Sequence, residues 1–286
     1  MSFKASVIVR SYNRIPALLE LIEVLRSQSF DSFEIVIVEQ STRYDKSDWE
    51  KLESLCGEDT RIKLLKYEPL GGPRARNEGV KNSSGDILIF VDDDDLPGSN
   101  TWIDNHIKAY KDEKLVGFTG KHIFEGSDSC PYVSWIRWFI RRKCMSYNWL
   151  KLPYTFAQFD EDVKNVEWLH GTNSSIRRDW ALKAGLWDTQ VKNQDEHSFA
   201  FKLHPYLVDG YRIDFKKEPA LIRRMDIEGG MEKRNFSFIR EWENNFNYCK
   251  KVIFKYFPSR IKFYPIYIYW CFVKVIQHLL SRKKIK

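Results

Sequence analysis

The sequence predicts an α/β fold with a mainly parallel sheet that has helices on both faces. Three observations indicate it. Short runs rich in Val and Ile alternate with stretches whose apolar residues recur every three to four positions. The apolar runs are almost unbroken, as strands covered on both faces must be. The chain of 286 residues, 43% of them hydrophobic, is long enough to bury a large core.

Strands and helices alternate regularly over the first 120 residues. Each expected strand is followed by a polar turn and then by a helical pattern, which predicts right-handed crossovers between parallel strands. Pro16 suits the first turn of the first helix. The expected strands are 5–10, 33–38, 61–67 and 86–91, and the expected helices lie near 15–25, 46–56 and 102–110. The Gly/Pro loop in EPLGGPRARNEGVKNSSG is expected to run into a further short helix.

The pattern loosens after about residue 120. Residues 166–188 indicate a strand, a turn and a helix, and 194–204 indicate another helix with acids in its first turn, where the helix dipole favours them. We therefore expect one main domain and a C-terminal helical, aromatic and basic extension. The expected divisions are a nucleotide-binding half at about 1–120, an acceptor half at about 121–225, and the extension at 226–286.

Composition narrows the class of protein. The five cysteines are scattered and never form a CxxC pair, which argues against a disulfide framework or a thiolate zinc site and suits the cytoplasm. The N-terminus MSFKASVIVRSYNR lacks the pattern of a signal peptide. The formal charge of +7 suits nucleic acid, an anionic membrane or a phosphorylated substrate. Because no nucleic-acid-binding motif accompanies it, we expect no nucleic-acid partner.

Four consecutive aspartates, Asp92 to Asp95, directly follow the fourth expected strand. In an extended chain, Asp92 and Asp94 would point to one side, and Asp93 and Asp95 to the other, toward backbone or donor sugar. Two carboxylates aimed at one point suit Mn2+ or Mg2+. No basic residue is close in sequence, so we expect the compensating charge to arrive with a metal-bound diphosphate substrate. The alternative is a solvated acidic loop or a helix cap.

Polar residues follow several of the expected strands. Ser11, Glu39 and Asp92 each come at a strand's end, and ligands of open α/β sheets bind at that edge. The segment GGPRARNEG brings Arg74 and Arg76 to the same edge, where guanidinium groups suit phosphate oxygens and planar bases. The alternative for these arginines is ordinary surface charge.

Four segments, ASVIVRSYNR, IVIVEQS, GGPRARNEG and FVDDDDLP, occur in the order and spacing of glycosyltransferase family 2. Over residues 4–225 the chain resembles that family. The resemblance implies a GT-A fold and an inverting enzyme that uses a nucleotide-diphosphate sugar, with UDP-sugars as first choice, and Mn2+ or Mg2+. It places the metal at Asp92 and Asp94, and the nucleotide near Ser11, Asn13, Glu39, Arg74, Arg76, Asp92 and Asp93.

The chain departs from the family pattern at two places. Many members read Asp-Asp-Gly-Ser where residues 39–42 are Glu-Gln-Ser-Thr, which leaves the identity of the base open. Arg10 stands where a proline or threonine is more usual.

Residues 171–203 resemble the acceptor block of the family, in which a Glu-Asp pair precedes a helix that ends in a basic residue. Here the order is reversed, as Asp195 and Glu196. An alignment on Lys202 puts Glu196 at the position of the catalytic base, with Asp195 as the alternative. A carboxylate suits this role because the acceptor hydroxyl must lose a proton. Acids that cap a helix are the structural alternative.

The C-terminal stretch 263–286 is marginal for a membrane-spanning helix. It predicts either an interfacial segment on an anionic membrane, joined by WIRWFIRRK at 135–143, or a helix packed on the domain. With the resemblance, this predicts transfer to a glycan or lipid-linked acceptor in cell-surface polysaccharide biosynthesis, at the inner face of the cell membrane. A nucleotidyl or sugar-phosphate transferase, and an inactive glycan- or membrane-binding relative, are the alternatives.

Overall fold

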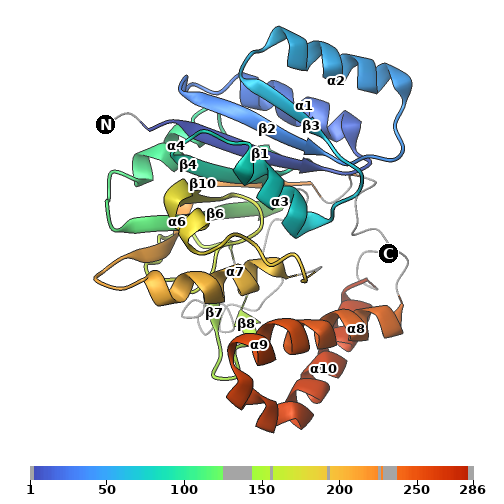
Figure 1. Ribbon diagram of the computed structural model, residues 1–286, viewed down its shortest axis with the longest axis vertical. Helices are drawn as coiled ribbons and strands as arrows, with labels where there is room; N and C mark the ends of the chain where they lie inside the picture. The colour runs from blue at the N-terminus through green and yellow to red at the C-terminus, as the bar shows by residue number, and fades with distance from the viewer. Residues whose placement is uncertain are drawn as a thin grey trace.

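The computed structural model describes residues 3–124, 144–154, 157–191, 194–224, 227 and 237–282. Within these ranges, one sheet of eight strands lies between two layers of helices, and further helices gather near the C-terminus (Figure 1). The strands are β1 Ala5–Ser11, β2 Phe33–Glu39, β3 Ile62–Lys66, β4 Ile87–Asp92, β5 Asp95–Pro97, β6 Leu115–Phe124, β9 Ser174–Arg177 and β10 Arg212–Arg223, with a separate hairpin of β7 Ser146–Tyr147 and β8 Pro153–Tyr154. The α-helices are α1 Ile15–Arg26, α2 Lys46–Glu58, α3 Gly72–Lys81, α4 Trp102–Ala109, α6 Arg178–Lys183, α7 Asp195–Leu203, α8 Phe238–Tyr248, α9 Phe254–Tyr256 and α10 Tyr264–Arg282. Three short helical turns, His204–Tyr206, Cys249–Ile253 and Pro258–Phe263, complete the elements.

The sheet is mainly parallel in its N-terminal half, as expected. Its strand order is β3-β2-β1-β4-β9-β6-β10-β5. β1 pairs in parallel with both β2 and β4, and β2 pairs in parallel with β3. β9 then runs antiparallel between β4 and β6, and β10 runs parallel to β6. The predicted fold class is confirmed, and the carboxyl ends of β1, β2 and β4 lie together at one edge.

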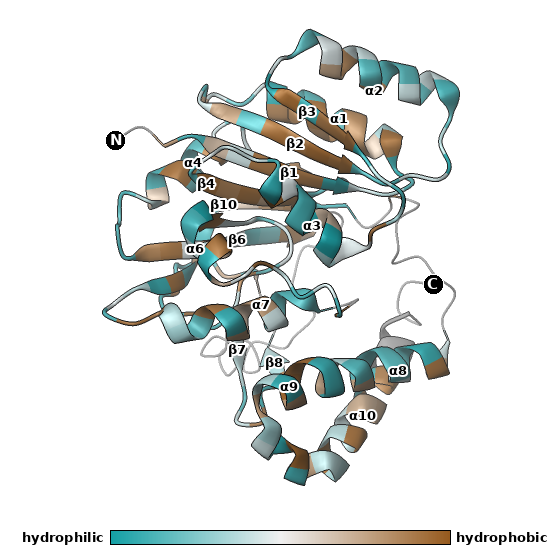
Figure 2. Cartoon of the chain, viewed as in Figure 1, coloured by the Kyte–Doolittle hydropathy of each residue, from teal (hydrophilic) through white to brown (hydrophobic). Residues whose placement is uncertain are grey.

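The strands bury side chains on both faces because alternate residues of a strand point to opposite sides. Val7 and Val9 of β1 join a core formed with α1, α2 and α4, whereas Ile8 joins a second core formed with α3, α6 and α7. Figure 2 shows the hydrophobic strands enclosed between more hydrophilic helices. The unbroken apolar runs of the sequence therefore reflect cover on both faces.

A pair of hydrogen bonds joins the two halves of the main domain. The Asn77 side chain of α3 donates from Nδ2 to the Trp187 carbonyl at 2.9 Å and accepts from the Trp187 amide at 3.0 Å. Both groups are buried. The contact holds α3, from the N-terminal half, against the segment that leads into α7.

The C-terminal helices pack on the domain, which is one of the two predicted arrangements. The hydroxyl of Tyr267 in α10 donates to the Leu150 carbonyl at 2.7 Å, and that of Tyr248 in α8 donates to the Lys151 carbonyl at 3.3 Å. Both acceptors belong to the loop between β7 and β8. Of the helices that the structure describes, none is both long and apolar enough to cross a membrane. The segment 135–143 lies outside the described residues, and the division at residue 225 stays a prediction.

Candidate active site

The strand register brings the predicted residues to one edge of the sheet. Ser11 is the register partner of Glu39, and Arg10 is the register partner of Asp92. The expectation that Ser11, Glu39 and Asp92 line the same edge is therefore correct as geometry. Ser11 is buried at this edge.

The four aspartates do not stay extended. Asp92 ends β4, the next two residues form a turn, and Asp95 begins β5. Carboxylate oxygens of Asp92, Asp94 and Asp95 consequently lie within 4.8 Å of one another. Asp93 points elsewhere: it pairs with Arg14 at 3.0 Å and accepts from the Tyr12 amide at 3.3 Å. The expected grouping of Asp95 with Asp93 is wrong, because the turn reverses the alternation.

Arginines from distant parts of the chain compensate this acidic cluster. Arg10 contacts Asp92 at 2.5 Å, and Arg14 contacts Asp94 at 2.5 Å. Arg223 of β10 approaches Asp95 at 3.3 Å. The expectation that the positive charge must arrive with the substrate is wrong, since folding itself brings three guanidinium groups to the aspartates.

Burial and the arginines set the ionisation of the cluster. Burial raises the pKa of Asp93 and of Asp95 to about 7. Asp92 behaves differently: burial alone would raise its pKa, but Arg10 and Arg223 hold it below the usual value. Asp92 is therefore ionised at neutral pH. Together with Asp94 and Asp95 it offers the oxygen ligands that Mn2+ and Mg2+ prefer, so the residues fit a divalent ion.

Asn13 and Glu39 hold the loop that follows β2. The Asn13 side-chain oxygen accepts from the amides of Thr42 and Arg43 at 2.9 and 3.1 Å. The Glu39 carboxylate accepts from the Ser41 amide at 2.9 Å and from the Ser41 hydroxyl. Both residues thus shape the edge of the sheet through a loop whose backbone they fix.

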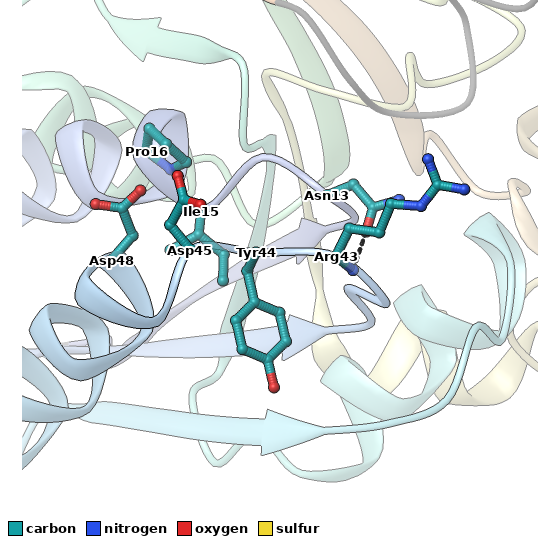
Figure 3. A pocket seen from close by; sticks show the side chains of 7 residues that line it. All are labelled: Asn13, Ile15, Pro16, Arg43, Tyr44, Asp45 and Asp48. Atoms are coloured by element: carbon teal, nitrogen blue, oxygen red, sulfur yellow. Dashed lines mark hydrogen bonds between the residues drawn. The ribbon is translucent and has the colours of Figure 1, made fainter.

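Two hollows of about 390 Å³ each flank this loop. Tyr44 borders both, is half exposed, and packs on Trp49 with ring centroids 4.7 Å apart. The first hollow is shown in Figure 3, where the Arg43 guanidinium points away from the Tyr44 ring. The first is lined by Asn13, Ile15, Pro16, Arg43, Tyr44, Asp45 and Asp48, and the second by Glu39, Ser41, Tyr44, Trp49, Lys66, Tyr67 and Glu68. Sequence reasoning missed the aromatic residues; two aromatics in an otherwise polar stretch, 40–51, were the available signal.

The acids of α7 have different environments. Asp195 is buried and forms an ion pair with Arg76, which also donates to the Gly171 carbonyl at 3.3 Å. Within the described part of the chain, no basic side chain forms an ion pair with Glu196. Burial and the neighbouring Asp195 raise the pKa of Glu196 to about 7. A carboxylate with this pKa can accept a proton near neutral pH.

The two arginines of GGPRARNEG separate. Arg76 is buried, and its guanidinium lies over the Trp187 ring, 5.0 Å from the centroid, as well as beside Asp195. Arg74 is exposed on the first turn of α3 and makes no ion pair with any described residue. The prediction that both arginines bind the nucleotide is not tested, but only Arg76 lies among the acids of the site.

Lys202, used above to align the acceptor block, has a structural contact. Its ammonium group donates to the Gly185 carbonyl at 2.7 Å and to the Leu186 carbonyl. Gly185 and Leu186 have φ values of 74° and 56°, so the chain turns sharply there. Lys202 therefore fixes the end of α6 against α7.

Comparison with known proteins agrees with this architecture. The profile of glycosyl transferase family 2 matches residues 6–184, which include β1 to β4 and the aspartates but end before Asp195 and Glu196. An uncharacterised glycosyltransferase of Rickettsia felis is 40% identical over 93 residues, or 32% of this chain and only 15% of that relative.

A glucosyl-dolichyl phosphate glucuronosyltransferase of Haloferax volcanii is 22% identical over 267 residues, which cover 90% of this chain and 79% of that protein. Among solved structures, the mannosyltransferase PcManGT of Pyrobaculum calidifontis, in complex with GDP-Man and Mn2+, is similar with a TM-score of 0.60 and 16% identity. This match covers 100% of this chain and 76% of that chain, and shows the GT-A fold.

Proposed function

The chain belongs to glycosyl transferase family 2, and from this premise we propose that it transfers a sugar, with inversion, from a nucleotide-diphosphate sugar to a lipid-linked glycan in cell-surface polysaccharide synthesis. One observation carries the proposal: Arg10, which pairs with Asp92 of the three-carboxylate cluster, also interacts with Glu196, an acid whose pKa is raised to about 7. Burial alone would lower the pKa of Arg10, but Asp92 and Glu196 both raise it, so Arg10 connects the two acidic groups.

The acidic cluster is the proposed site of a divalent ion. Asp92, Asp94 and Asp95 would hold Mn2+ or Mg2+, which would neutralise charge on the leaving nucleoside diphosphate. The PcManGT complex, which contains Mn2+ with its nucleotide sugar, supports this assignment. Asp92 is the anchor of the set because the arginines beside it keep it ionised.

Glu196 is the proposed base. The acceptor hydroxyl gives its proton to the Glu196 carboxylate, its oxygen bonds to the anomeric carbon, and the bond from that carbon to the diphosphate breaks. A single displacement of this kind inverts the anomeric configuration. Asp195 is less suited to the role because Arg76 already occupies its carboxylate.

The hollow beside Glu39 is the proposed site for the nucleobase. Tyr44, Trp49 and Tyr67 supply aromatic surface, and Glu39 supplies a buried carboxylate at its edge. We propose a UDP-sugar as donor, since a small base would suffice to cover the exposed Tyr44 ring.

The hydrolysis of UDP- and GDP-sugars, each with Mn2+, Mg2+ or EDTA, tests the choice of donor and the dependence on a metal ion together. Release of a nucleoside diphosphate supports the proposal, and a panel without any turnover contradicts it.

The C-terminal helices support a membrane-bound acceptor. Between residues 244 and 286 the sequence has ten Lys or Arg and no Asp or Glu. Tyr269 and Ile261 are 68% and 59% exposed on these helices, and Phe272 is exposed beside them. Lys255 pairs with Asp188 of the main domain, but the segment as a whole carries an excess of positive charge. Apolar side chains next to such an excess suit the anionic cytoplasmic leaflet. The Haloferax relative, named for a dolichyl phosphate substrate, supports a lipid-linked acceptor.

Vesicle binding tests this surface. We expect wild-type protein to co-sediment with vesicles of phosphatidylcholine and phosphatidylglycerol, and to bind pure phosphatidylcholine more weakly. Tyr269→Glu should reduce binding about tenfold, because it removes apolar area and adds a negative charge. Val208→Glu is the matched control, since Val208 is 56% exposed in the loop before β10. Equal losses in the two variants would contradict the assignment.

A further inference from the structure

Arg10 occupies an unusual place for a strand residue at a site built from acids. It is the next-to-last residue of β1, and its Nη2 lies 2.5 Å from Asp92 Oδ1. Its side chain is 20% exposed, so it is partly accessible to solvent. The charged group is thus neither fully exposed to solvent nor fully buried.

The guanidinium of Arg10 lies between the two acidic groups. Burial alone would lower its pKa, but Asp92, Asp195 and Glu196 raise it. Burial, and after it the positive charge of Arg10, lower the pKa of Arg76, so the two positive groups are neighbours. In the proposed reaction the diphosphate leaves toward the aspartates, whereas the acceptor loses its proton to Glu196. Arg10 therefore lies between the aspartates, toward which the diphosphate would leave, and Glu196, which would take the proton.

A glycine gives Arg10 this position. A Cβ added to Gly72, at the start of α3, would lie 2.8 Å from Arg10 Nη1, and no other atom outside the local chain would come within 4 Å of it. The guanidinium is consequently held between the Asp92 carboxylate and the backbone of α3. The first turn of that helix carries unpaired backbone N–H groups, which favour anions rather than cations. The pair with Asp92 offsets this unfavourable neighbourhood.

The other two carboxylates of the cluster, Asp94 and Asp95, form ion pairs with arginines other than Arg10. Arg14 divides its charge between Asp93 and Asp94, and Arg223 contacts Asp95 from β10. The positive charge of Arg10 also interacts with Glu196. A purely structural ion pair would not need this second interaction.

We propose that Arg10 is a donor-binding residue that competes with the divalent cation for Asp92 and contacts the donor diphosphate when the cation takes that carboxylate. The proposal rests on the proposed function for the diphosphate and adds a residue that the metal cluster does not include. An Asp92 carboxylate shared by two cations binds each more weakly than it would bind one. Once Asp92 is occupied, the planar guanidinium matches phosphate oxygens two at a time.

Two binding measurements test Arg10 without turnover. The first titrates Mn2+ alone and follows free Mn2+ by electron paramagnetic resonance. Arg10→Gln should bind Mn2+ about tenfold more tightly than wild type, because one charge-assisted competitor is gone. The second measures the binding affinity for UDP, and for GDP as a second probe, at saturating Mn2+. Here Arg10→Gln should bind about tenfold more weakly, because a phosphate contact is lost.

Two further variants make the result specific. Gly72→Ala keeps the charge but displaces the guanidinium, so both affinities should shift in the same directions by a smaller factor. Arg26→Gln removes a charge that pairs with Glu23 and Asp59 at the end of α1, so both affinities should stay within about twofold of wild type. Thermal melting checks that each variant is folded.

The outcomes separate this inference from the proposed function. If wild type binds Mn2+ and nucleoside diphosphate but Arg10→Gln changes neither affinity, the role of Arg10 is wrong and the proposed function stands. Weaker Mn2+ binding by Arg10→Gln also overturns the competition. If Arg10→Gln does not fold, an unchanged pair of affinities in Gly72→Ala overturns it instead. A wild-type protein that binds neither probe overturns both proposals.

Discussion

The two acidic groups of the site are compensated in different ways. Every carboxylate of Asp92–Asp95 forms an ion pair with an arginine, whereas in the pair on α7 the described residues give an ion pair to Asp195 but not to Glu196. Burial raises the pKa of Asp93, Asp95 and Glu196 to about 7, whereas Arg10 and Arg223 hold the pKa of Asp92 below its usual value against the effect of burial. An acid held by arginine suits the binding of a cation or a loop. An acid without such a partner, and with a raised pKa, suits the transfer of a proton.

Removal of the unpaired acid is expected to have the largest effect on activity. Glu196→Gln should lower kcat about 10²- to 10⁴-fold, because an amide cannot accept the acceptor proton. The KM for the donor and the melting temperature should change little, since no described basic group pairs with Glu196. Steady-state kinetics with a glycan acceptor measure kcat and KM for both proteins. Unchanged kcat would place the base elsewhere.

Removal of the paired acid should instead damage the fold. Asp195→Asn leaves the buried Arg76 guanidinium without its ion-pair partner, so the free energy of unfolding should fall by about 3–5 kcal/mol. Urea denaturation measures the change. A double variant, Arg76→Met with Asp195→Leu, should recover most of the loss. A single variant as stable as wild type would show that the ion pair contributes little.

Within the aspartate run, substitutions of the neighbours Asp93 and Asp94 should differ in their effect on Mn2+ affinity. Asp94→Asn should weaken Mn2+ binding on the order of tenfold to a hundredfold, because Asp94 belongs to the three-carboxylate cluster. Asp93→Asn should change Mn2+ affinity less than about threefold, since its oxygens face Arg14 and the Tyr12 amide. Equal losses, measured by the same titration, would mean that the turn between β4 and β5 does not separate their roles.

The pH profile offers the smallest and finest comparison. Glu196 acts when deprotonated, so kcat/KM should fall about tenfold per pH unit below its pKa of about 7. The negative charge of Asp195 helps to raise that pKa, so Asp195→Asn should move the acidic limb to lower pH. A limb that stays in place, or moves to higher pH, would contradict the coupling.

The sequence predicted the edge of the site better than its interior. Ser11, Glu39 and Asp92 could be placed together because parallel strands end at a common edge. The position of the turn at Asp93 could not be predicted, since aspartate favours turns and four identical aspartates do not show at which of them the strand ends.

The arginine partners of the aspartates could not be predicted from the sequence, for a different reason. Arg10 is 82 positions from Asp92, and Arg223 is 128 positions from Asp95. No local pattern connects such residues, because strand order and register alone bring them together. The same holds for Tyr44, whose exposed ring is defined by the loop that Asn13 holds.

The Asn77 contact with Trp187 has a consequence for engineered chimeras of such enzymes. The amide of Asn77 satisfies both backbone groups of Trp187, as a neighbouring strand would, across 110 positions of sequence. An exchange of the N-terminal half between relatives would therefore transplant one side of this contact without the other. A leucine at position 77 would leave two buried backbone groups unpaired, at a cost of about 1–3 kcal/mol each. Donor modules of this type should be exchanged together with residues 185–188, or only between relatives that keep an asparagine there.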